Sequence, residues 1–139
     1  MPGQVREVLV AVGDAVRRIE AENFRGYRAA GVWVEVTTLI VPTVNDSPAE
    51  LAAMAAFLRE ELGPDTPWHL TRFHPAYALR HLPVTPRATL HQARAVAREA
   101  GLRYVYTNAE TGGEGWHTAC AGCGATVIER AHDALVANH

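Results

Sequence analysis

Residues 32–47, VWVEVTTLIVPTVNDS, decide the fold that this sequence predicts. The run from Val32 to Val41 is apolar or β-branched apart from Glu35, a pattern typical of a strand covered on both faces in a parallel sheet. Pro42 ends the strand because proline has no N–H to donate, and residues 43–47 form a polar turn into a helix. Ligands bind at the carboxyl ends of parallel strands, so this turn is the first candidate for a functional site.

The composition favours a single globular domain. The 139 residues suffice for one hydrophobic core, and a hydrophobic fraction of 48% is ordinary. The net charge of −2 gives no support for binding to nucleic acid or to an anionic membrane. No apolar run is long enough to span a bilayer, and residues 1–7 lack the pattern of a signal peptide. The two cysteines argue against a disulfide scaffold and favour a cytoplasmic location.

Helix and strand patterns alternate around the central strand. The predicted elements are a helix over 4–22, a helix over 48–62 with Ser47 as its N-cap, strands over 68–73 and 102–107 with a helix from 86 to 100 between them, a short strand over 127–130 and a helical turn over 131–137. Such alternation implies parallel strands joined by right-handed crossovers. Three strands leave exposed edges, so the chain is expected to be part of something larger: half a barrel, a truncated enzyme or an obligate oligomer.

Five motifs follow one another in a characteristic order. They are VWVEVTTLIVPTVNDS at 32–47, WHLTRFHPAY at 68–77, AGLRYVYTN at 100–108, CAGCG at 120–124 and VIER at 127–130. In this order they resemble the radical S-adenosylmethionine (SAM) enzymes of the AmmeMemoRadiSam system, which are relatives of the pyruvate formate-lyase activating enzymes. The resemblance runs from about Gly31 to Arg130 and covers roughly the C-terminal half of such an enzyme.

The resemblance implies an α/β fold. Residues 1–110 would form the C-terminal half of a partial (β/α) barrel with parallel strands and crossover helices, and residues 111–139 a Cys/His-containing tail packed on it. In the family, a C-x3-C-x2-C loop holds a 4Fe–4S cluster that reduces SAM to a 5′-deoxyadenosyl radical. That loop is absent here, because the only cysteines are Cys120 and Cys123. The chain alone is therefore predicted to be inactive. A cluster-bearing N-terminal half or a homo-oligomer is the expected partner, and a protein glycyl site is one possible substrate.

The central strand has one face with polar groups. Alternation places Glu35, Thr37 and Leu39 on the same face, and burying the two polar side chains without partners would cost a few kcal/mol. By resemblance, Thr37 occupies the position from which this strand contacts SAM, whereas the alternative is a threonine bonded to neighbouring backbone. Glu35 could form a salt bridge with an arginine or bind a ligand.

Four further residues are candidates for contact with SAM. Asn45 and Asp46 could hydrogen-bond the ribose or the methionyl group, although both residue types also stabilise turns and cap helices. Arg72 supplies a fork of donors for a carboxylate. The family carries a histidine near SAM after the strand that corresponds to residues 68–73. This makes His74 the strongest single candidate; the alternative is a surface histidine.

The tail contains a Cys-x2-Cys-Gly knuckle at Cys120, Cys123 and Gly124, and His117 adds a third metal donor. Zinc requires four ligands, and the fourth could come from His132, Glu114, water or another subunit. A redox-active pair and two free thiols are the alternatives. Two hypotheses result. In the first, the chain is the SAM and substrate side of a radical SAM enzyme; in the second, it is a non-catalytic metal-binding or partner-binding α/β module.

Overall fold

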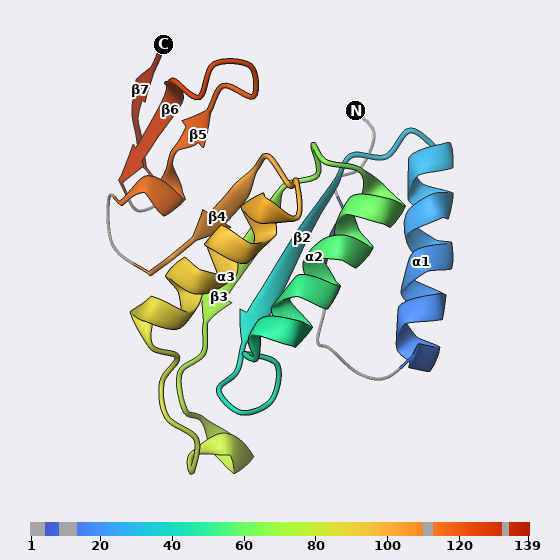
Figure 1. The fold of residues 1–139 in the computed structure, drawn as a ribbon, viewed down its shortest axis with the longest axis vertical. Helices are drawn as coiled ribbons and strands as arrows, with labels where there is room; N and C mark the ends of the chain where they lie inside the picture. The colour runs from blue at the N-terminus through green and yellow to red at the C-terminus, as the bar shows by residue number, and fades with distance from the viewer. Residues whose placement is uncertain (1–4, 9–13, 110–112, 132–133) are drawn as a thin grey trace.

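The computed structural model describes residues 5–8, 14–109, 113–131 and 134–139. Four parallel strands form one sheet in the order β1-β2-β3-β4. They are β1 (Val5–Val8), β2 (Val34–Ile40), β3 (Trp68–Arg72) and β4 (Val105–Thr107). Three α-helices lie on one face of this sheet (Figure 1): α1 (Asp14–Ala29), α2 (Pro48–Leu62) and α3 (Arg87–Glu99). A short 3-10 helix, η1 (Tyr77–Leu79), lies in the loop between β3 and α3.

The tail forms a second sheet. Its strands are β5 (Thr118–Ala119), β6 (Thr126–Ala131) and β7 (Ala134–Asn138), which pair antiparallel in that order. A short 3-10 helix, η2 (Glu114–Trp116), precedes β5. This sheet stands beside β4 at one side of the molecule (Figure 1). Among the described residues, none of the helices combines the length and the apolar character that a membrane span requires.

The predicted C-terminal half of a partial barrel is wrong. The four parallel strands form an open sheet, and the cysteine-containing tail forms a separate antiparallel sheet. Barrel closure depends on strand tilt and on the stagger between neighbouring strands, whereas hydrophobic periodicity reports only which face of each element is buried. The alternating pattern could therefore indicate crossover helices without indicating whether the sheet curls into a barrel.

Two local predictions are wrong in part or in full. The helix expected over 4–22 is a strand at Val5–Val8, whereas from Asp14 onward the prediction is confirmed by α1. Valine suits a strand better than a helix once a partner is available, and β1 pairs in parallel with β2. The helical turn expected over 131–137 is the strand β7, which pairs with β6. The short strand expected over 127–130 is confirmed as β6.

The helix predicted over 48–62 is confirmed as α2. Ser47 is the N-cap: its Oγ accepts a hydrogen bond from the Glu50 N–H at 3.2 Å and donates one to Glu50 Oε2 at 2.8 Å. Pro48 follows at the first turn, where its missing N–H costs nothing. Gly63, with φ of 93°, ends the helix. The predicted boundaries hold here because every signal is local.

The core lies between the sheet and the helices. Alternate residues of β2 are buried against the helices, and Thr38 among them accepts a 2.9 Å hydrogen bond from Trp68 Nε1. The intervening residues, including Glu35 and Thr37, are only half-buried. The expectation that this strand is covered on both faces is therefore not met. We call the helix-free side of the parallel sheet its open face.

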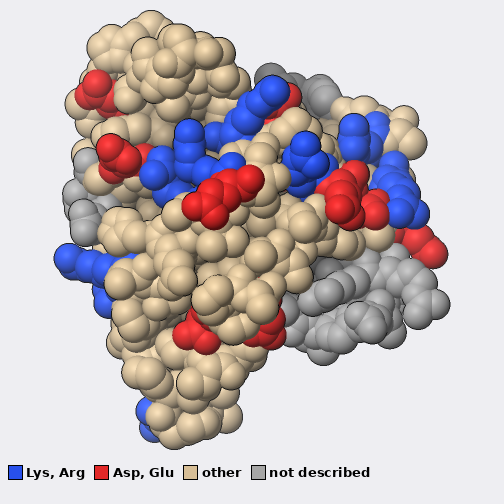
Figure 2. Space-filling model, viewed as in Figure 1, with Lys and Arg blue, Asp and Glu red and all other residues tan. Residues whose placement is uncertain are grey.

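The opposite, helix-covered face carries charges of both signs. In Figure 2, arginine and acidic side chains are interspersed in a band across this face. Exposed ion pairs among the described residues include Arg25 with Glu61 and Arg103 with Asp65, each at 2.8 Å. Such exposed pairs contribute little to stability. The open face carries the more informative polar groups.

Candidate functional site

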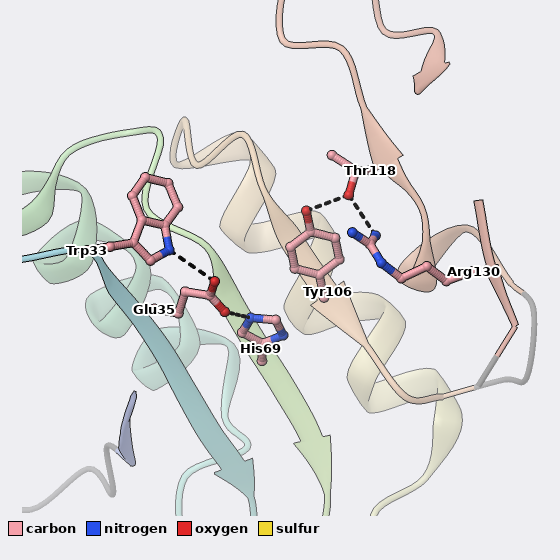
Figure 3. Close-up of polar contacts among 6 residues, drawn as sticks. All are labelled: Trp33, Glu35, His69, Tyr106, Thr118 and Arg130. Carbon is pink, nitrogen blue, oxygen red and sulfur yellow. Dashed lines mark hydrogen bonds and ion pairs between the residues drawn. The ribbon is translucent and has the colours of Figure 1, made fainter. Parts of the chain in front are cut away.

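A cavity of about 690 Å³ lies between the open face and the tail. The sheet contributes Glu35 from β2, His69 from β3 and Tyr106 from β4, and the tail contributes Thr118 from β5 and Arg130 from β6. Figure 3 shows these side chains pointing into one region. This volume is in the range of small-molecule sites.

A carboxylate–histidine pair occupies the sheet side of the cavity. Glu35 Oε2 lies 3.0 Å from His69 Nε2, and the side chains are 17% and 34% exposed respectively. Trp33 Nε1 donates a 3.0 Å hydrogen bond to the other oxygen, Glu35 Oε1. A carboxylate at Nε2 favours the imidazole tautomer with its hydrogen there, which leaves Nδ1 as an acceptor. The alternatives considered for Glu35 did not include a histidine partner.

A second polar group joins the sheet to the tail. The Tyr106 hydroxyl lies 2.9 Å from Thr118 Oγ1, which accepts a 2.7 Å hydrogen bond from Arg130 Nη1. The Arg130 guanidinium also lies over the Tyr106 ring, 5.8 Å from its centroid. On the sheet, the Tyr106 ring stacks with that of His69 at a centroid distance of 5.0 Å. Tyr106 therefore contacts both halves of the cavity wall.

Gly115 lets the tail approach the sheet at this point. A Cβ atom on Gly115 would clash with Thr107 Oγ1 and would come within 3.1 Å of the Thr107 carbonyl oxygen. Only glycine fits such a close backbone approach. The 3-10 helix that carries Trp116 into the cavity wall is therefore held directly against the end of β4.

Thr37 is the one predicted SAM contact on the open face. It is half-buried and aligned with His69 of the neighbouring strand. Asn45 is fully buried instead: its Oδ1 accepts from the Val41 N–H at 2.7 Å, and its Nδ2 donates to the Leu39 carbonyl at 3.0 Å. Asp46 Oδ1 accepts from the Thr43 N–H at 2.9 Å. Both side chains thus make the hydrogen bonds of the turn-stabilising alternative.

Arg72 and His74 lie at the carboxyl end of β3. Arg72 is aligned with the buried Ile40, and its Nε donates to the Thr85 carbonyl at 2.7 Å, so it belongs to the helix-covered side. His74 follows the strand and is exposed. The structure therefore does not place Arg72 on the same face of the sheet as Thr37. None of the five predicted SAM contacts is among the residues that line the cavity.

The cysteine knuckle forms the turn between β5 and β6. The Cys120 N–H donates to the Ala125 carbonyl at 2.7 Å, and the Gly124 N–H donates to the Cys120 carbonyl at 2.9 Å. His117 Nδ1 accepts a 3.2 Å hydrogen bond from the Arg130 N–H. Within the described part of the chain, no three or more His, Cys, Asp or Glu side chains are grouped to hold a metal ion. The fourth-ligand candidate His132 lies outside the described residues.

The Cys120 thiol is expected to ionise below the usual pH. The backbone N–H groups of Cys123 and Gly122, followed by the Cys123 side chain, stabilise the Cys120 thiolate and lower the pKa of this thiol. In the Cys123→Ser variant, alkylation of Cys120 by iodoacetamide should therefore begin at lower pH than in the same variant unfolded in urea. Mass spectrometry of timed samples measures both profiles. Coincident profiles would contradict the stabilisation.

The cavity residues were not predicted as a group. Alternation along 68–73 does place His69 and Thr71 on one face, and this pattern is visible in the sequence. The contact of the His69 side chain with Glu35, two residues before its register partner Thr37, depends on how β2 and β3 are aligned, and the approach of Arg130 depends on the tail. Neither is encoded in a local pattern.

The fold and the cavity define a small α/β protein with a potential ligand site between two sheets. Comparison with curated proteins finds 52% identity over 100 residues with the uncharacterized protein MJ0808 of Methanocaldococcus jannaschii. The alignment covers 72% of this chain and 30% of that protein, so the chain spans about a third of the relative's length. No protein-family model matches the sequence.

Proposed function

We propose that this chain is the SAM- and substrate-side segment of a radical SAM enzyme, a class that reductively cleaves SAM to a 5′-deoxyadenosyl radical. The observation that carries the proposal is the polar open face, where Thr37 lies half-buried beside His69. Among the described residues, the Thr37 hydroxyl has no hydrogen-bond partner, so it is free to contact a ligand. The motif order of the sequence adds the family resemblance.

This chain does not fit the iron–sulfur cluster of that class. A cluster of this kind needs three thiolates from one loop, and the chain has Cys120 and Cys123 alone. The cluster would therefore be held by another polypeptide segment, either an N-terminal half or a second subunit. The relative, of which this chain covers 30%, is long enough to carry such a segment. We place the assembly in the cytoplasm, with a protein as one candidate substrate.

The chain's own residues would bind and orient SAM. Thr37 offers a hydroxyl from the open face, and His74 offers an exposed imidazole at the carboxyl end of β3. Arg72 lies on the helix-covered side and its Nε bonds the Thr85 carbonyl, so its part is to hold the end of β3 and not to contact a ligand on the open face. Asn45 and Asp46 hold the turn after β2 in shape, because their side chains are bonded to its backbone.

Equilibrium dialysis with labelled SAM tests the binding half of this proposal. We expect weak binding, with a Kd on the order of 1 mM, because the cluster that chelates SAM is absent. Thr37→Val and His74→Ala should each weaken binding by about fivefold to tenfold. His81→Ala is the matched control, because His81 is also exposed and its ring bonds the Ala78 carbonyl instead. Equal binding by all four proteins would contradict the assignment.

A chimera tests the enzyme class. In the chimera, the segment of MJ0808 that matches this chain is replaced by the 100 matching residues of this chain. Both proteins are reconstituted with iron and sulfide without oxygen and reduced with dithionite, and 5′-deoxyadenosine is measured by chromatography. We expect the product from both. Its absence from both would refute the radical SAM proposal, and its absence from the chimera alone would refute the role of this segment.

A second candidate function is that of a metal-binding module. The specific observation is that backbone N–H groups of the knuckle face the Cys120 sulfur, as they do around metal-bound thiolates. Zinc titration followed by elemental analysis distinguishes this function: bound zinc that Cys123→Ser abolishes, with no cluster absorption after reconstitution, would support it. A chain that retains no zinc after dialysis would refute it.

A further inference from the structure

Arg130 has unused hydrogen-bonding capacity inside the cavity. Its Nη1 donates to Thr118 Oγ1 at 2.7 Å and to the Trp116 carbonyl at 3.2 Å, which occupies both hydrogens of that nitrogen. Its Nε and Nη2 groups bond no other described residue, and no described carboxylate pairs with it. The Nε and Nη2 edge is the fork with which arginine holds a carboxylate. Arg130 is thus positioned by the protein and open to a ligand.

On the sheet side of the cavity, the Nδ1 atom of His69 is a hydrogen-bond acceptor. Glu35 fixes the His69 ring through Nε2, so that Nδ1 remains an acceptor in the neutral imidazole. The Glu35 carboxylate is itself bonded by Trp33 and His69. Arg130 is therefore the cation of this cavity that lacks an anionic partner among the described residues.

Aromatic rings form much of the remaining wall. Trp33 stands at the edge of the cavity, 55% exposed, with its indole fixed by the bond to Glu35. Tyr104, Tyr106 and Trp116 also line the space. Flat, rigid side chains of this kind favour a flat ligand, because ring stacking adds to the burial of apolar area.

From these contacts we infer that the cavity binds a small aromatic carboxylate. The carboxylate meets the Nε and Nη2 edge of Arg130, and the ring lies against the aromatic wall. A monoanion suits the charges better than a dianionic phosphate, since the cavity holds the Glu35 carboxylate together with a single arginine. This inference does not depend on the proposed function, because none of the predicted SAM contacts lines the cavity.

Benzoate, benzamide and phenyl phosphate are the probes that test it. Two of the chain's three tryptophans, Trp33 and Trp116, line the cavity, so tryptophan fluorescence reports on its occupancy. We expect benzoate to bind with a Kd on the order of 1 mM and benzamide at least tenfold more weakly. Benzamide binding as tightly as benzoate, phenyl phosphate binding more tightly, or no fluorescence change with benzoate would overturn the inference.

Variants locate the binding. Arg130→Lys keeps the charge and removes the fork, and should weaken benzoate binding about tenfold. Arg25→Lys is the matched control, because Arg25 forms its bidentate pair with Glu61 on the helix-covered side. Should Arg130→Lys fail to fold, Trp33→Ala provides the second test and should weaken binding about fivefold, read by the shift of the Tyr106 side-chain resonances. Unchanged affinity in the folded variant would overturn the inference.

Discussion

Replacement of Trp68 by alanine is expected to lower the free energy of unfolding by about 3–5 kcal/mol. The Trp68 side chain is fully buried in the core between the parallel sheet and the helices, so its loss leaves a large cavity that the packed neighbours cannot fill. The change also removes the partner of the buried Thr38 hydroxyl. Urea unfolding followed by circular dichroism at constant pH measures the difference. A loss of this size is a large part of the total unfolding free energy of a marginally stable domain.

Two further variants separate packing from hydrogen bonding. Thr38→Val keeps the shape of the side chain and leaves Trp68 Nε1 without its acceptor, so it should cost about 1–3 kcal/mol. Thr38→Ser keeps the hydroxyl and should cost less. Trp33→Ala is the control for removing an exposed indole, because Trp33 is 55% exposed and outside the core. A cost for Trp68→Ala no larger than that for Trp33→Ala would contradict the packing argument.

The elements that could be predicted from the sequence are those with local signals. Helix α2 is the best example. Ser47 and Pro48 specify its start and Gly63 its end, and each of them lies at the helix end that it specifies. Helix α3 and strands β3 and β4 were also predicted, although their observed bounds are shorter. The prediction of this helix from 86 to 100 did not show the role of the preceding Thr85, which is fully buried and bonded to Ile40 at the end of β2 and to Phe73 just after β3.

The elements that could not be predicted depend on partners far along the chain. Strand β1 exists through pairing with β2, and β7 through pairing with β6. Whether the parallel sheet is open or closed depends on strand stagger, which periodicity does not report. Family resemblance supplied a barrel in place of that missing information, and the sheet is open.

In the candidate site, too, features with local signals could be predicted and features that depend on distant partners could not. Asn45 and Asp46 could be assigned to a turn from their residue types alone, and their bonds are those of a turn. The Glu35–His69 pair joins residues 34 positions apart, and Arg130 reaches the cavity from the second sheet. Residue types indicate that half-buried polar side chains need hydrogen-bond partners. Which partners they contact is determined by the register of β2 with β3.

Replacement of Thr85 by valine is expected to cost about 2–4 kcal/mol of unfolding free energy, because it leaves two buried backbone groups without partners. Thr85 Oγ1 donates to the Ile40 carbonyl at 2.6 Å and accepts from the Phe73 N–H at 2.8 Å. One hydroxyl thus ties the carboxyl end of β2 to the residue that follows β3, just before α3 begins. Valine matches the shape of threonine, so the expected loss comes from hydrogen bonding rather than from a cavity.

Thr85→Ser is the matched variant, because it keeps the hydroxyl and removes only a methyl group; it should retain most of the stability. Hydrogen exchange provides a local readout, since the Phe73 amide should exchange faster in Thr85→Val and remain protected in Thr85→Ser. Equal unfolding free energies and equal Phe73 protection in the two variants would show that the hydroxyl does not hold these strand ends. Lower stability and faster Phe73 exchange in Thr85→Val alone would show that the buried Thr85 hydroxyl holds the end of β3. Arg72 at that end would then owe its position to Thr85, whose carbonyl its Nε bonds, and not to the exposed loop after β3.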